Sequence, residues 1–176
     1  MPINIPLLNE QTPQTVLKMI KLEASQLSLP DSRELMWGAF GAYAVLQALA
    51  QAFNHSVLGS LLYGALSAGI LYGATYGLLR VLKDDAKFQR TATALAIMGA
   101  IAALAYIILH LIFGIALPPP LPTEKLLRFL LFPILIWMVF MYAFLFRHVS
   151  LRPVPAFVAA SLYVIVIEVI LSPICR

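Results

Sequence analysis

TATALAIMGAIAALAYIILHLIFGIAL occupies residues 91–117, and no Asp, Glu, Lys or Arg interrupts it. A helix needs roughly 20 apolar residues to cross the hydrocarbon core of a bilayer. Lipid offers no partner for unpaired backbone groups, so an open strand cannot span the core, whereas a helix can. The stretch therefore predicts a transmembrane helix.

The composition extends this prediction to the whole chain. Hydrophobic residues make up 61% of the 176 residues and charged residues 11%, against about 45–50% and about 25% in soluble domains. A core surrounded by water cannot hide such an excess in a chain of this length. The twelve Lys and Arg residues are spread between apolar stretches. This spacing is typical of membrane proteins and argues against a nucleic-acid partner.

Five apolar stretches are long enough to span, which predicts an all-α bundle of five transmembrane helices behind an N-terminal amphipathic interfacial helix. Residues 1–33 would form a cytoplasmic segment and residues 34–176 the transmembrane domain. The expected spans are residues 35–53, 57–79, 91–117, 129–146 and 154–175. We expect Asp31 to be the N-cap of the first span, because Glu34 three positions later completes a capping-box pattern.

Positive charge orients these spans. With the N-terminus inside, nine Lys and Arg residues lie in inner segments and three in outer segments, a clear bias under the positive-inside rule. We therefore expect the N-terminus in the cytoplasm and the C-terminus outside. The inner residues are Lys18, Lys21, Arg33, Arg80, Lys83, Lys87, Arg90, Arg147 and Arg152; the outer ones are Lys125, Arg128 and Arg176.

The N-terminal segment carries an apolar stripe at helical spacing, with Lys18 and Lys21 on the other side. This pattern predicts a helix in the headgroup region, its lysines near anionic lipid. The alternative is a helix packed on the inner loops. The stripe consists of Val16, Ile20, Ala24 and Leu27.

Small residues recur at every fourth position of the second span. They lie on one helix face and allow another backbone to approach closely, which drives helix association in lipid. We expect the first and third spans to cover this face within the monomer; the alternative is a contact with another subunit. The residues are Ala65, Gly69, Gly73 and Gly77.

Two ionisable residues and two glutamines lie inside the spans. His110 and Glu168 both fall in the outer halves of their helices, so they could pair if the helices adjoin, and Gln47 and Gln51 share one face of the first span. An ionisable group at such depth is costly and marks a functional site by default. The alternative is a structural hydrogen bond between helices, in which the tyrosines of the spans satisfy Glu168 or the glutamines.

Catalytic patterns are missing from the sequence. No His, Cys, Asp and Glu residues show metal-ligand spacing, and there is no serine elbow or phosphate loop. We expect a protein that is not an enzyme, without a cofactor or a metal site.

Three segments resemble the Yip family of Rab-associated membrane proteins and its bacterial relatives. They are RTATALA at residues 90–96, Ile136-Trp137, and residues 147–170, where a basic inner loop leads into the fifth span. The resemblance implies a cytoplasmic N-terminal segment, five spans and an external C-terminus, and it favours the bacterial inner (plasma) membrane. No functional residue is carried over, because the Asp-Leu-Tyr-Gly-Pro segment of eukaryotic members is absent.

These patterns favour a membrane scaffold or accessory subunit that acts through helix–helix association. Its partners would be the lipid bilayer and either another membrane protein or further copies of itself. The alternative is a small oligomeric channel or transporter that uses His110 and Glu168.

Overall fold

The computed structural model describes residues 11–21, 28–53, 56–116, 123–149, 151–171 and 174–175. Its regular structure in these residues is entirely helical, without a strand, so the prediction of an all-α protein is confirmed. The helices are α1 (Gln11–Ile20), α2 (Arg33–Gln51), α3 (Val57–Val81), the short η3 (Asp85–Lys87), α4 (Phe88–Ala116), α5 (Thr123–Arg147), α6 (Pro153–Ile165) and η4 (Val166–Leu171), a π-helical continuation of α6.

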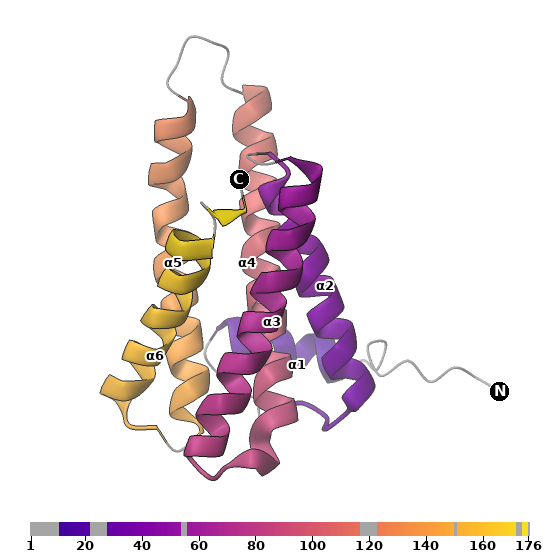
Figure 1. Ribbon diagram of the computed structural model, residues 1–176, viewed down its shortest axis with the longest axis vertical. Coiled ribbons are helices and arrows are strands. Elements are labelled where there is room, and N and C mark those ends of the chain that lie inside the picture. The colour runs from indigo at the N-terminus through magenta and orange to yellow at the C-terminus, as the bar shows by residue number, and fades with distance from the viewer. Residues whose placement is uncertain are drawn as a thin grey trace, which may run out of the picture.

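The five long helices run alternately up and down beside one another, and α1 lies across them near the end where α3 joins α4 (Figure 1). Helix α4 packs against α2 and α3 on one side and against α5 on the other. Helix α6 completes the bundle by packing along α5. The central position of α4 agrees with its sequence, which is apolar on every face.

Three helical segments are long and apolar enough to cross a membrane, judged by length and composition: Val57–Val81, Asp85–Phe113 and Pro153–Leu171. Large apolar side chains also cover much of the outer surface, among them Leu58, Val81 and Val154. Such a surface is costly in water and suits a hydrocarbon environment. The chain thus has the character of a membrane-embedded protein.

Helix α2 is capped by Ser32, so the expectation that Asp31 is the N-cap is wrong. Ser32 has an extended backbone, and its hydroxyl oxygen accepts a hydrogen bond from the Leu35 amide at 3.3 Å. This satisfies one of the amides that every helix leaves free at its start. The Asp31 carboxylate instead lies 3.9 Å from the Arg90 guanidinium near the start of α4.

Helix α1 turns part of its apolar stripe toward the bundle. Met19 is completely buried, and Val16 and Ile20 pack against the same core. Lys18 and Lys21 are exposed. This contact between α1 and the bundle agrees with the alternative of a helix packed on the protein instead of on lipid. Ala24 and Leu27 lie outside the described residues.

Close helix packing depends on three glycines whose missing side chains make room for neighbours. A Cβ at Gly64 would overlap the carbonyl of Ala44, which fixes the contact between α3 and α2. A Cβ at Gly99 would lie 2.5 Å from the Tyr43 ring and 2.6 Å from the Tyr142 hydroxyl oxygen. The third, Gly59, is in contact with the carbonyl of Cys175 in the same way.

Replacing Gly99 by alanine should destabilise the protein by about 1–3 kcal/mol, the usual cost of overpacking a core. Both tyrosines that meet this position are completely buried, so neither ring can turn out into solvent to make room. Thermal unfolding of the purified protein in mild detergent would measure the loss.

Gly69→Ala is the matched control, because nothing lies within 4 Å of a Cβ at that position. This variant should be as stable as the native protein or slightly more stable, since alanine favours the helix. Equal stability of the Gly99→Ala and native proteins would contradict the packing described above.

Candidate functional site: a polar cluster inside the bundle

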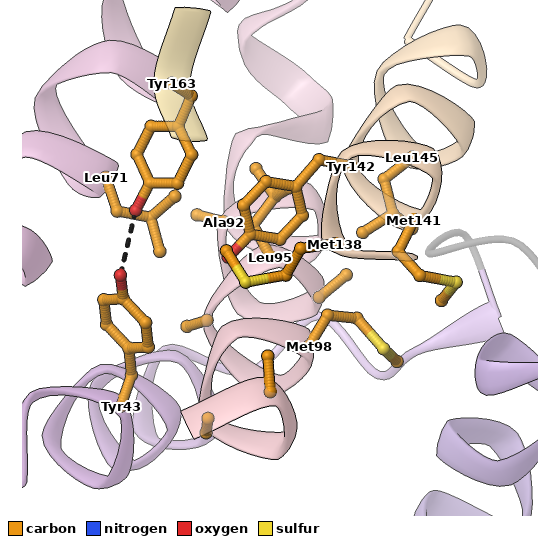
Figure 2. Packing of buried hydrophobic residues seen from close by; sticks show 14 of the residues in the cluster. Tyr43, Leu71, Ala92, Leu95, Met98, Met138, Met141, Tyr142, Leu145 and Tyr163 are labelled. Carbon is orange, nitrogen blue, oxygen red and sulfur yellow. Dashed lines mark hydrogen bonds between the residues drawn. The ribbon is translucent and has the colours of Figure 1, made fainter. Parts of the chain in front are cut away.

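Two tyrosine hydroxyls meet in the centre of the bundle. The hydroxyl of Tyr43 on α2 lies 3.0 Å from that of Tyr163 on α6 and is hydrogen-bonded to it (Figure 2). Both side chains are buried. Because a buried hydroxyl without a partner is costly, this bond links the first and last long helices.

Glu168 lies next to this pair, on the π-helical segment η4. Its carboxyl group is a hydrogen-bond partner of the Tyr63 hydroxyl on α3. The Tyr63 hydroxyl also lies 3.4 Å from the backbone carbonyl of Ile167, so two acceptors compete for its single proton. Glu168 belongs to neither the Lys87–Asp84 nor the Arg90–Asp31 ion pair. Its carboxyl group is therefore held by hydrogen bonding and not by an opposite charge.

The two predicted glutamines belong to the same cluster. Gln47 and Gln51 are 4% and 8% exposed, one turn apart on the inner face of α2. Gln47 is a hydrogen-bond partner of Tyr43, and Gln51 of Tyr63. Three of the four polar residues singled out in the sequence, the two glutamines and Glu168, therefore meet in one place.

A cavity of about 70 Å³ opens beside these residues. Its polar side chains are Gln47, Gln51, Tyr106 and Glu168, and they come from α2, α4 and η4. The remaining wall is apolar and is formed by Ala50, Ala102, Ala103, Ile134, Leu135 and Met138. The cavity can thus offer oxygen atoms to a small polar ligand while keeping it within the helix bundle.

His110 lies apart from this cavity and does not line it. Its ring stacks on Phe53 at 4.2 Å and on Tyr106 at 6.0 Å between ring centres. Its Nδ1 is buried and has no hydrogen-bond partner among the described residues. Tyr106 stacks on His110 and also lines the cavity, so it lies between the two. His110 and Glu168, which could pair if their helices adjoined, form no direct pair among the described residues.

A second, larger hollow of about 230 Å³ lies between α3, α5 and α6. Its wall is almost entirely apolar; only Thr75 and Tyr163 bring polar groups. The Thr75 hydroxyl is already bonded to the carbonyl of Leu71 at 2.7 Å. This hollow therefore offers few free polar groups that could bind a polar ligand.

The small-residue face of α3 is exposed. Ala65, Gly69, Gly73 and Gly77 all lie on the outer surface, and nothing lies within 4 Å of a Cβ placed at any of the three glycines. The expectation that the first and third spans cover this face is therefore wrong. Helix α3 contacts α2 through Gly64 instead, on its opposite side.

From the sequence, the tyrosines of the spans could be identified only as a group. In the structure, four of them belong to the polar cluster or line its cavity: Tyr43, Tyr63, Tyr106 and Tyr163. Their signal was weak because tyrosine is also common at membrane interfaces. No group of three or more His, Cys, Asp and Glu residues that could hold a metal ion is found among the described residues.

No protein-family model, no curated protein and no solved structure matches this chain. The geometry described above is therefore the basis for the functional proposals that follow.

In a buffer without alkali cations, Glu168→Gln should leave stability nearly unchanged, because the amide keeps a hydrogen-bonding group beside Tyr63. Glu168→Leu removes that partner and should lower the free energy of unfolding by about 0.6–2 kcal/mol, the range for hydrogen bonds between helices in membranes. Denaturation in mild detergent would compare the two variants. A Glu168→Leu protein as stable as the native one would show that the carboxyl group does not hold the helices together.

Proposed function

We propose that this protein is a non-enzymatic integral membrane scaffold or accessory subunit that acts through helix–helix association. The observation that carries the proposal is the open small-residue face of α3, a helix long and apolar enough to cross a membrane. In lipid the hydrophobic effect does not drive helices together, so association depends on close backbone contact. A stripe of glycine and alanine four residues apart allows that contact.

The partner helix would come from another membrane protein or from a second copy of this chain. The polar cluster inside the bundle supports a mainly structural core, because Tyr43, Tyr63 and Tyr163 find their partners within it. The proposed association surface is therefore separate from the interior polar groups, as expected for a subunit that binds its partner through its outer surface.

The proposed topology has five spans, with α2 and α5 added to the three helices that meet the length and composition criteria. The N-terminus would lie in the cytoplasm of a bacterial cell, the C-terminus outside, and the spans in the inner membrane. Support comes from the alternating helix directions (Figure 1) and from the positive charges at the end where α3 joins α4. On this topology α1 lies at the inner surface, with Lys18 and Lys21 toward lipid headgroups. The Yip-like layout is part of the same proposal.

Reporter fusions test this topology. Fusions at Lys87 and Ser150 should give cytoplasmic signals, and fusions at Ser56 and Arg176 external signals, because the positive charges hold the intervening loops inside. The measurement is paired reporter activity, one enzyme active only inside and one only outside. A cytoplasmic signal at Arg176 would exclude five spans.

A small oligomeric channel or transporter is the second candidate, favoured by the cavity at Glu168. Transport needs a hydrated path, and an intramembrane carboxyl group is a frequent part of one. His110 contacts Tyr106 and not Glu168, so the pair on which this idea first rested is indirect. We therefore rank association above transport.

Gly73→Leu should weaken association of the protein with its membrane partner while leaving the monomer folded. The leucine would project from the open α3 face and hold the partner backbone away, and a Cβ at this position has no neighbour from another helix within 4 Å. Size-exclusion chromatography with light scattering in mild detergent, together with mass analysis of co-eluting proteins, would measure the assembly.

Gly41→Leu provides the control, since it makes the same change at an exposed position of α2 with nothing within 4 Å of its Cβ. It should leave assembly intact. If the two variants and the native protein assemble equally, the α3 face is not an association surface.

A further inference from the structure

We propose that the cavity between α2, α4, α5 and η4 binds a monovalent alkali cation, with Glu168 as its charged ligand. Oxygen atoms of Gln47, Gln51 and Tyr106 would complete the protein's contribution. The inference goes beyond helix association and does not depend on it.

Charge is the first argument. Glu168 faces a cavity whose lining contains no Lys, Arg or His, and it belongs to neither the Lys87–Asp84 nor the Arg90–Asp31 ion pair. A carboxyl group inside a membrane is stable in its charged form only with a compensating positive charge, because burial otherwise favours the protonated acid. One monovalent cation neutralises it, whereas a divalent cation would leave an excess charge in the bilayer.

The donor atoms and the size of the cavity agree with this class of ion. A carboxylate, two side-chain amides and a phenol supply oxygen atoms, which hard cations prefer. Each amide oxygen has two lone pairs, so Gln47 and Gln51 can interact with their tyrosines and with a cation at once. A cavity of about 70 Å³ also holds the ion with several waters, each of which needs about 10–15 Å³.

The backbone around Glu168 gives an independent argument. The chain changes from α-helix to π-helix at Val166–Leu171, inside an apolar segment that could span a membrane. Single π-helical turns within α-helices occur frequently at functional sites. Here the π-helical segment carries the carboxyl group that lines the cavity.

Thermal unfolding of the purified full-length protein in mild detergent tests the proposal, at constant pH and ionic strength in sodium, potassium or choline chloride. Sodium or potassium should raise the melting temperature over choline in a saturable way, because a ligand that binds only the folded state stabilises it. Glu168→Gln should abolish the difference, and Glu34→Gln, which changes an exposed carboxylate, should retain it.

Gln51→Met keeps the side chain's size but removes an oxygen donor, and should raise the half-saturating cation concentration by about tenfold or more. It also provides a readout if Glu168→Gln does not fold. Identical melting temperatures of the native protein in the three salts would overturn the proposal. So would a cation effect that survives in a folded Glu168→Gln protein or that Gln51→Met leaves unchanged.

Discussion

The hydrogen bond between the hydroxyls of Tyr43 and Tyr163 reflects the constraint on which the bundle depends: polar groups among apolar helices must satisfy one another. The two residues are far apart in sequence, so meeting this requirement links α2 to α6 through their side chains across the bundle. Gly99 on α4 makes it possible, because any larger residue would occupy the space of the Tyr43 ring. The remaining hydroxyl in this layer, that of Tyr142, has no hydrogen-bond partner among the described residues. The Tyr142 ring instead packs 5.2 Å from the Tyr163 ring.

Sequence predicted the helices well because their existence depends on local properties. The length of an apolar run and the charges that flank it are read directly from the chain. Helix α3 begins at Val57 and α6 at Pro153, at or beside the expected starts, since Ser56 caps the former and proline suits the first turn of the latter. The error at Asp31 has a similar local cause. Asp31 and Ser32 are adjacent, both residue types cap helices, and only the ion pair with Arg90 separates their roles.

Sequence did not predict how the helices face one another. The spacing of Gly69 and Gly73 shows that they share a face, but it does not show which neighbour covers that face or whether any does. Similarly, the positions of His110 and Glu168 along their helices predicted a similar depth in the membrane. They did not show toward which neighbouring helix each side chain points. His110 turns toward Phe53, whereas Glu168 turns toward the cavity. The side of a helix that faces a given neighbour is set by contacts between segments that are distant in sequence. It therefore cannot be predicted from the residues of each span taken separately.

Helix α3 separates the two surfaces to which we assign roles. Its buried side brings Tyr63 to Glu168 and Ser67 to Tyr43, while Gly69 and Gly73 lie on its outer side. A partner helix on the outer side would touch no residue of the cavity. Any influence of the partner on cation binding would have to pass through a displacement of α3 itself. Gly64 restricts such a displacement, because it seats α3 against the backbone of α2 without free space. The two roles are therefore separable by mutation, and coupling between them would require the contact between α2 and α3 to change.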